Sequence, residues 1–261
     1  MIDKTAIVNS GAELAEDVKV GPYAIIESGV EIGAGTEVHA HAVVREGTRL
    51  GKNCRVHSGA VLGGEPQDVK FGGEESFLII GDGTILREGF TAHRGSGEQS
   101  ETRIGSGCML MATAHVGHNC VVGNGVVMAN AVNLGGFVQV GDRAFVGGLT
   151  GVHQFTRIGA FVMVGGGSVV LEDIPPYMLV TGGYRPPVCG LNRIGLMRAG
   201  FDQDTRRAMH KAYRLLYKSG LSVSEAVERI KTDLQDIEEI GILIDFLESK
   251  SDRGICRGRE D

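Results

Sequence analysis

The chain has 261 residues and a formal net charge of −6, which allows a substantial core and excludes the strongly basic surface typical of nucleic-acid-binding proteins. It contains 41 glycines but only six prolines and no tryptophan, and 42% of its residues are hydrophobic, so we expect a packed fold with many tight turns. The five cysteines are widely separated without paired ligand spacings, and no apolar run reaches membrane-spanning length, so the sequence predicts a cytoplasmic protein with reduced thiols and neither a secretory nor a transmembrane segment.

A six-residue repeat organises residues 1–176. An aliphatic residue occupies the first position of each hexad, and a small or β-branched residue often lies four places after it. The repeat runs in one register from Ile2 to Leu62 and again from Ile104 to Val170. Short strands of this kind must stack on equivalent strands of neighbouring coils to bury an apolar face. The repeat therefore predicts a mainly β protein, a parallel β-helix with three hexads per triangular coil. Its handedness stays open at this point, although general crossover rules favour a right-handed turn.

Two interruptions in the repeat are each one coil long, because 18 residues separate the hexads before and after each break. Residues 63–79 and 92–103 are therefore predicted to leave the prism as excursion loops, which commonly carry functional residues. Three of the cysteines, Cys54, Cys108 and Cys120, occupy small corner positions of the repeat and are interpreted as packing residues.

A different domain is predicted after Asp173-Ile174-Pro175-Pro176, where two prolines end the repeat. Residues 177–190 are expected to form an irregular or extended connecting segment, and residues 191–261 a small all-α C-terminal domain. The expected helices lie at Leu191–Ala199, at about 203–218 after an Asp202 cap, after a cap at Ser222 or Ser224, and at about 237–249. The charged tail 251–261 is expected to fray.

Four motifs, together with the repeat, the two excursions and the helical end, resemble one family. The motifs are His93-Arg94-Gly95, Ala114-His115-Val116-Gly117-His118, Val152-His153-Gln154-Phe155 and Asp173-Ile174-Pro175-Pro176-Tyr177. Over essentially the whole chain they resemble the UDP-N-acetylglucosamine acyltransferases, which catalyse the first step of lipid A biosynthesis. The resemblance implies a left-handed parallel β-helix and a homotrimer with active sites between subunits. It also implies transfer of a 3-hydroxyacyl chain from acyl carrier protein to the 3-hydroxyl of UDP-N-acetylglucosamine, with no cofactor and no metal.

His118 is the candidate general base. It occupies the third position of its hexad, where a side chain should face outward, and an imidazole suits proton abstraction near neutral pH. A surface histidine on a corner is the alternative interpretation. Residues 18 apart should stack in one column, which predicts that His118, Gly136 and Gln154 lie on successive coils. The resemblance assigns the general base to His118 and an oxyanion-binding backbone N–H to Gly136.

The resemblance also supplies the substrate-binding candidates. They are Gln67, Asp68 and Lys70 in the first excursion, His93, His115, His153 and Gln154 in the prism, and Asn192 and Arg198 near the first C-terminal helix, where a cation would help to bind the diphosphate. Gly166 matches a position related to acyl-chain length and, as glycine, is expected to favour a longer chain.

Four residues depart from the family pattern. Asn119 stands where many relatives have aspartate, Phe137 replaces a histidine, Ile194 replaces an acid and Ala199 replaces a second arginine. These departures leave open whether the acceptor is the 3-hydroxy sugar or its 3-amino analogue.

Basic residues cluster on the helix predicted at 203–218. They could be a solvated helix face or a dock for the acidic acyl carrier protein, in which case association would be salt-sensitive; the residues are Arg206, Arg207, Lys211, Arg214 and Lys218.

Three other functions are alternatives to this family. Another hexapeptide-repeat transferase using acetyl-coenzyme A would explain the repeat but not the helical domain. A zinc-dependent β-helical carbonic anhydrase would need three converging histidines, for which His115, His118 and His153 are a superficial match that lacks the expected spacing. A non-catalytic scaffold would not require the outward histidines.

Overall fold

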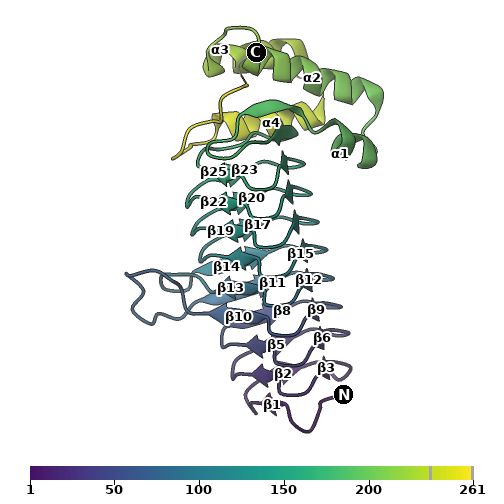
Figure 1. Ribbon diagram of the computed structural model, residues 1–261, viewed down its shortest axis with the longest axis vertical. Coiled ribbons are helices and arrows are strands. Elements are labelled where there is room, and N and C mark those ends of the chain that lie inside the picture. Colours follow the sequence, from purple (N-terminus) through teal and green to yellow (C-terminus); the bar gives the residue numbers. More distant parts are fainter. Residues whose placement is uncertain (235–236, 260–261) are drawn as a thin grey trace.

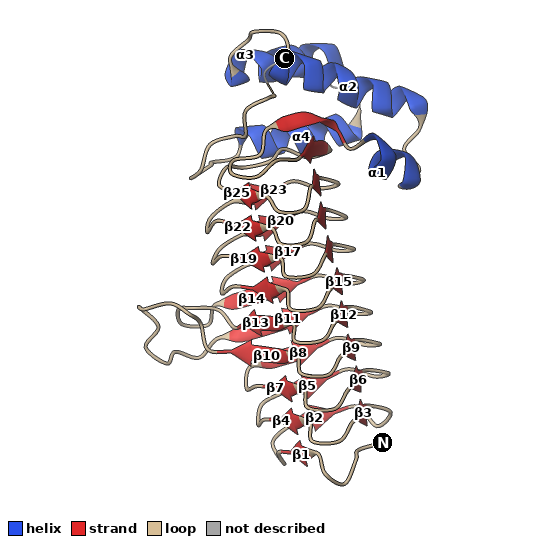
Figure 2. Cartoon of the chain, in the orientation of Figure 1, coloured by secondary structure: helices blue, strands red, loops and turns tan. Residues whose placement is uncertain are grey.

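The prism dominates the structure. The computed structural model describes residues 1–234 and 237–259, and Figure 1 shows a stack of triangular coils rising from the N-terminus to a cap of helices. Each coil of the prism contributes one short strand to each of three sheets, so through Val170 the strands of one sheet pair in parallel and recur every third element along the chain. The chain is a left-handed parallel β-helix with a helical C-terminal region, coloured red and blue in Figure 2.

The three sheets form the three sides of the triangle, and the third alone ends in an antiparallel pair within the described residues, Met178–Val180 with Val188–Leu191. The first sheet contains, in spatial order, β1 (Ile7–Val8), β4 (Ile25–Ile26), β7 (Val43–Val44), β10 (Val61–Gly64), β13 (Thr91–His93), β16 (His115–Val116), β19 (Asn133–Leu134), β22 (Gly151–Val152) and β25 (Val169–Val170). The second contains β2 (Glu13–Leu14), β5 (Glu31–Ile32), β8 (Thr48–Leu50), β11 (Phe77–Ile80), β14 (Glu101–Ile104), β17 (Val121–Val122), β20 (Gln139–Val140) and β23 (Arg157–Ile158). The third contains β3 (Lys19–Val20), β6 (Glu37–Val38), β9 (Arg55–Val56), β12 (Ile85–Leu86), β15 (Met109–Leu110), β18 (Val127–Met128), β21 (Phe145–Val146), β24 (Met163–Val164), β26 (Met178–Val180) and β27 (Val188–Leu191).

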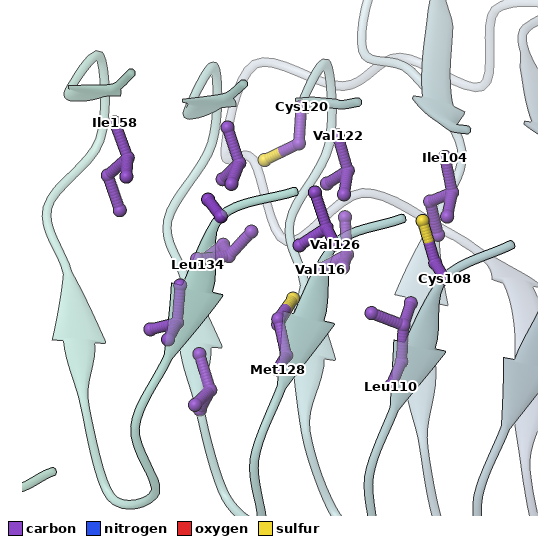
Figure 3. Close-up of a cluster of buried hydrophobic side chains, with 14 of the residues drawn as sticks. Ile104, Cys108, Leu110, Val116, Cys120, Val122, Val126, Met128, Leu134 and Ile158 are labelled. Carbon is purple, nitrogen blue, oxygen red and sulfur yellow. The ribbon is translucent and has the colours of Figure 1, made fainter. Parts of the chain in front are cut away.

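The core of the prism is a column of first-position side chains. Val116 pairs in register with Leu134, and both are at most 1% exposed, as is Leu110 on the adjoining side. Figure 3 shows these side chains meeting at the centre of the coils. Each aliphatic side chain buried in this way contributes about 1.5–3 kcal/mol of transfer free energy, which no single coil could obtain without its neighbours.

Glycine serves two different purposes at the corners. The fourth position of most hexads has a left-handed backbone, with φ of 66° at Gly107 and 63° at Gly125, a conformation that glycine adopts without steric cost. The second position has a different reason for glycine, since the φ of Gly117 is not positive. A Cβ on Gly117 would lie 2.8 Å from the carbonyl oxygen of Leu134, so close approach of the next coil requires glycine there.

Three cysteines fill small corner positions, as predicted from the repeat. Cys54, Cys108 and Cys120 are free thiols with at most 1% exposure. Each Sγ–H donates to a glycine carbonyl of the next coil, at 3.1–3.2 Å. Burial raises the pKa of the Cys120 thiol to about 12, so this group stays protonated and acts as a small packing residue.

The two excursions leave the prism between β10 and β11 and between β13 and β14, where Figure 1 shows loops projecting to one side. The C-terminal helices are α1 (Arg193–Arg198), α2 (Gln203–Tyr217), α3 (Val223–Leu234) and α4 (Glu238–Glu248). Several of their buried side chains, Leu196, Met209 and Ile230 among them, belong to the same apolar cluster as the prism. Within residues 1–234 and 237–259, no helix combines the length and apolarity needed to cross a membrane.

The C-terminal tail does not fray through residue 259, contrary to expectation. Ile255 forms a parallel bridge with Asp173, and Gly258 forms one with Val188, so the tail adds backbone hydrogen bonds to the upper end of the prism. The last two residues of the expected tail, 260 and 261, lie outside the described residues.

A buried ion pair joins this end of the prism to the helices. The Arg157 Nε–H donates to Asp173 Oδ2 at 2.7 Å, and the Arg157 backbone N–H donates to Oδ1 at 2.8 Å. Asp173 is fully buried, while the Arg157 guanidinium also bonds Ser249 Oγ and lies 4.5 Å from the centre of the Phe246 ring.

We expect Asp173→Ala to lower the free energy of unfolding by about 3–5 kcal/mol, because it leaves the Arg157 charge buried without its counter-ion. Guanidinium-induced unfolding measures the change. Glu31→Ala is the control, since its pair with Arg49 is about half exposed and should contribute less than about 1 kcal/mol. Equal losses of unfolding free energy in the two variants would contradict the larger contribution expected of the buried pair.

Candidate active site

A cavity of about 540 Å³ opens on the first sheet, beside the excursion loops. Histidines from three coils of this sheet line it: His93 ends β13, His115 begins β16, and His153 follows β22, two coils beyond β16. The other lining residues are Gln67, Gly117, His118, Asn133, Leu134, Gly135, Gly136, Gly151, Val152, Gln154, Val169 and Leu171. The cavity therefore collects most of the candidate residues of the prism.

His118 has a defined tautomer, because Asn119 has a defined amide orientation. Asn119 Oδ1 accepts the Ser96 N–H at 2.9 Å, and its Nδ2 donates to the Ser96 carbonyl at 3.3 Å. The amide oxygen also lies 2.8 Å from His118 Nδ1, so Nδ1 must carry the proton and donate it. The lone pair of the neutral imidazole is then on Nε2, where a base needs it.

Gly136 lies directly against the Nε2 side of the His118 imidazole. A Cβ built on Gly136 would be 2.6 Å from His118 Nε2, a distance that no side chain can adopt without moving the ring. Among the described residues, no acceptor takes the Gly136 backbone N–H. The stacking of His118, Gly136 and Gln154 is confirmed, since Phe137 N–H donates to the His118 carbonyl and Phe155 N–H to the Gly136 carbonyl, both at 3.0 Å.

His93 and His115 form an edge-to-face pair with ring centres 4.6 Å apart. Burial, reinforced by the neighbouring His115 and His118, lowers the pKa of His93 to about 4. Burial and then His118 lower the pKa of His115 as well, and its Nδ1 lies 2.8 Å from Thr91 Oγ1. A histidine with a lowered pKa stays neutral at physiological pH, so His93 offers a polar but uncharged surface to a ligand.

The two excursions are tied together above His118. Ser96 Oγ–H, in the second excursion, donates to Asp68 Oδ2 in the first at 2.8 Å, and Ser96 also holds Asn119. The Lys70 backbone N–H donates to Asp68 Oδ1 at 3.0 Å, and this bond, followed by the Ser96 bond, lowers the pKa of the Asp68 carboxyl. A chain of contacts therefore runs from Asp68 through Ser96 and Asn119 to His118.

Several candidates lie away from this cavity in a single chain. Asn192 caps α1, where its Oδ1 accepts the Gly195 N–H and its Nδ2 donates to the Phe161 carbonyl, so its amide is already engaged. Arg198 is exposed at the end of the same helix. Gly166 follows β24 of the third sheet, a different corner from His118, and is exposed. The Lys70 side chain is exposed in its loop, with its backbone on Asp68.

The basic residues of α2 are not equivalent. Arg207 pairs with Asp204 at 3.0 Å and Lys211 with Asp233 at 2.8 Å, while Lys218 donates to the Arg259 carbonyl. Arg206 and Arg207 line a second cavity, of about 430 Å³, between α1 and α2; Leu191, Arg193, Leu196, Gln203 and His210 complete it. Arg214 is exposed on the same helix.

Sequence reasoning missed Ser96 and Thr91 as supports of the site. The repeat indicated that residues 92–103 leave the prism, but its period does not predict which residue of the prism a loop residue such as Ser96 will contact. Of the described residues, no three histidine, cysteine, aspartate or glutamate side chains are grouped to hold a metal ion.

Comparisons with known proteins show which family the sequence matches. The family model described as "Udp N-acetylglucosamine O-acyltransferase; Domain 2" matches residues 173–256, and the model for the bacterial transferase hexapeptide matches residues 11–46 and 29–64. A Trichlorobacter lovleyi protein named acyl-[acyl-carrier-protein]–UDP-N-acetylglucosamine O-acyltransferase is 52% identical, and the match covers 98% of this chain and 99% of that protein. A protein of the same name from Syntrophobacter fumaroxidans is 44% identical, with the same coverage.

Solved structures give the same result. The Acinetobacter baumannii protein called LpxA superposes with a TM-score of 0.94 at 41% identity, over 98% of this chain and 99% of that one. The Francisella novicida UDP-N-acetylglucosamine acyltransferase superposes with a TM-score of 0.95 at 33% identity, over 100% of this chain and 95% of that one. At these identities and coverages, the chain belongs to the acyl-[acyl-carrier-protein]–UDP-N-acetylglucosamine O-acyltransferase family.

Proposed function

We propose that this protein transfers a 3-hydroxyacyl chain from acyl carrier protein to the 3-position of UDP-N-acetylglucosamine, with His118 as general base. The family relationship supports the substrates, and relatives carry both of them in their names. One observation supports the mechanism above the others: the unprotonated Nε2 of His118 faces the cavity directly over Gly136. A general base and a backbone N–H donor this close together can act in one acyl-transfer step. The base accepts the proton of the attacking hydroxyl, and the N–H stabilises the carbonyl oxygen of the thioester.

The step follows from those two groups. His118 Nε2 accepts the proton of the sugar hydroxyl as the oxygen attacks the thioester carbonyl. The carbonyl oxygen gains negative charge in the tetrahedral intermediate, and the Gly136 N–H stabilises it. Collapse of the intermediate breaks the carbon–sulfur bond, and the imidazolium returns its proton to the departing thiolate. Asn119 holds the Nδ1 proton throughout, so the ring stays in its working tautomer.

The neighbouring residues bind the acceptor. His93 and His115 are the neutral donors and acceptors of the cavity wall, and His153 and Gln154 lie one coil beyond Gly136. Asp68, with Gln67 and Lys70 beside it, engages the sugar from the excursion, where its lowered pKa keeps it ionised. Asp68 then accepts hydrogen bonds from sugar hydroxyls.

A homotrimer completes the site. Asn192, Arg198 and Gly166 lie outside the cavity of one chain, so a second copy must supply them if they bind the nucleotide and the acyl chain. The proposed compartment is the cytoplasm, since all five cysteines are free thiols, which is typical of proteins in a reducing compartment.

His118→Ala should reduce turnover by about 10²–10⁴-fold, because the sugar hydroxyl loses its proton acceptor. The measurement is a mass-spectrometric assay with purified protein, 3-hydroxyacyl carrier proteins, UDP-N-acetylglucosamine and its 3-amino analogue. His41→Ala, on an exposed ring stacked on Tyr23 in a distant coil, is the control and should keep full activity. Activity in His118→Ala would remove the general-base assignment, and turnover of the amino sugar alone would change the acceptor.

Gly166 should make the enzyme prefer longer acyl chains. A Cβ at this position would already lie 3.1 Å from the Gly148 carbonyl oxygen, so any side chain must project outward into the space that glycine leaves open. Each additional buried methylene of the acyl chain contributes about 0.8 kcal/mol. Competition between short and long 3-hydroxyacyl carrier proteins, repeated with Gly166→Met, measures the preference. Wild-type preference for short chains, or no change in the methionine variant, would contradict the assignment.

The basic end of α2 is the proposed dock for acyl carrier protein, a strongly acidic partner. Asp204 pairs with Arg207 and Asp233 with Lys211, so attraction should be greatest at the second cavity, where Arg193 and Arg206 have no such carboxylate partner among the described residues. Complementary charge mainly accelerates association and is screened by salt.

Arg206→Glu should therefore lower kcat/KM for the carrier protein about tenfold at low salt and flatten its dependence on salt. Arg55→Glu is the control, because it makes the same charge change on an exposed position of β9 in the prism. If kcat/KM for the wild-type protein does not fall as the salt concentration rises, the assignment of α2 as the docking site for acyl carrier protein is wrong.

A further inference from the structure

An aromatic column leads from the candidate base to the C-terminal tail. The rings of His118 and Phe137 meet edge to face with centres 5.3 Å apart, and Phe137 stacks on Phe155 at 4.8 Å with planes 14° apart. The Arg253 guanidinium carbon lies 5.7 Å from the centre of the Phe155 ring, within the range of a cation–π contact. Phe137 and Phe155 occupy fourth positions of their hexads, with left-handed φ of 61° and 65°.

Arg253 makes a second contact at the cavity. Its Nε–H donates to the Gln154 carbonyl at 2.8 Å, and His153 Nδ1 lies 3.1 Å from the same oxygen. The carbonyl accepts from both, so the Nδ1 of His153 carries a proton and its Nε2 is left as an acceptor. One arginine thus touches both the end of the aromatic column and the backbone of a cavity-lining pair.

The backbone on either side of Arg253 is held in place. Ser251 Oγ accepts the N–H groups of Arg253 and Gly254, at 3.2 and 2.8 Å, and the Gly254 carbonyl accepts the Asp173 N–H at 2.8 Å. The tail therefore reaches Phe155 from a fixed point on the prism. Because its backbone is held in place, the Arg253 guanidinium can restrict the movement of the Phe155 ring that it contacts.

We propose that Arg253 is a positioning residue, which holds His118 in its working orientation through Phe155 and Phe137. The proposal rests on the proposed role of His118 as general base. Three groups confine the His118 ring: the Asn119 amide at Nδ1, the Gly136 backbone against Nε2, and the edge contact with Phe137. Ser96 holds the Asn119 amide, and Gly136 contributes only backbone, so rotation of the Phe137 side chain is the remaining source of movement. Phe155 and Arg253 restrict this rotation.

Disruption of the aromatic column should lower turnover more than it weakens binding of the acyl carrier protein. Small displacements of a catalytic group cost a large part of its effect, because the reacting atoms must be aligned to within a fraction of an ångström. Phe137 stands where the family pattern has histidine, so this chain replaces a polar neighbour of the base by a stack whose outer end is a cation. The sugar-contacting pair His153 and Gln154 should loosen at the same time, because Arg253 also supports their backbone.

The first test compares Arg253→Met, Arg253→Lys and the control Arg257→Met. Methionine keeps an unbranched apolar stem but removes both contacts, lysine keeps the charge, and Arg257 is an exposed arginine of the same tail. We expect Arg253→Met to lower kcat about tenfold with little change in KM for the carrier protein, Arg253→Lys to recover part of the loss, and Arg257→Met to match the wild type. Equal losses in the Arg253→Met and Arg257→Met variants would show a general charge effect and overturn the proposal.

The second test observes His118 directly. With histidine labelled at ¹³Cε1, the His118 resonance is the one missing from the His118→Ala spectrum. It should shift in Arg253→Met and in Phe155→Leu, a variant that breaks the column but leaves the Arg253 bond to Gln154. The kcat losses of the two changes should also combine less than additively, because both interrupt one column. An unmoved resonance together with wild-type kcat in Arg253→Met would overturn the proposal.

The two proposals fail in different ways. If His118→Ala retains activity, the general-base assignment falls, whereas the resonance in Arg253→Met still reports whether the tail controls the orientation of His118. If His118→Ala is inactive while Arg253→Met behaves as the wild type in both tests, the base stands and the positioning role of the tail falls.

Discussion

Each coil of the prism obtains its hydrogen bonds and its buried surface only from the coils above and below it. Strands in parallel pairing lie about 4.8 Å apart, which leaves no room for a side chain where the backbones of adjacent coils meet. Gly117 illustrates the constraint, since a Cβ there would press on the Leu134 carbonyl oxygen. The hexads must therefore stay in register, and every departure from the hexad pattern has to be accommodated outside the stack.

The same constraint builds the candidate site. Residues 18 apart are held one above another, so His118 lies over Gly136 without any dedicated loop to bring them together. The next column along the corner holds Asn119, Phe137 and Phe155, all with left-handed φ. In the proposed mechanism, one column supplies the base and the oxyanion donor, and the adjacent column orients the base. A rigid stack suits this task because a short displacement of the imidazole would separate Nε2 from its target.

Segments outside the stack complete the site from two directions. The excursions bring Ser96 and Asp68 over the Nδ1 side of His118, and the tail brings Arg253 to the far end of the aromatic column. Both segments are fixed by hydrogen bonds: the Ser96 backbone bonds the Asn119 side-chain amide, and the tail bonds the backbone of Asp173 and Val188. The buried pair of Arg157 and Asp173 anchors the surface on which the tail lies.

The hexads by themselves determined the prism, its packing cysteines, the position of the two excursions and the stacking of His118 on Gly136, because a fixed period and a buried first position leave a coil no other arrangement. Helix caps and apolar spacing likewise indicated α1 to α4. The hexads could not determine handedness, and resemblance to a family supplied it along with the proposed role of His118. Only the tertiary structure decided that Asn119 faces Ser96, that Asn192 caps α1, and that Arg253 reaches Phe155. Those contacts join residues of unrelated sequence separation, and where a loop or tail settles depends on the surface it meets, which no local period encodes.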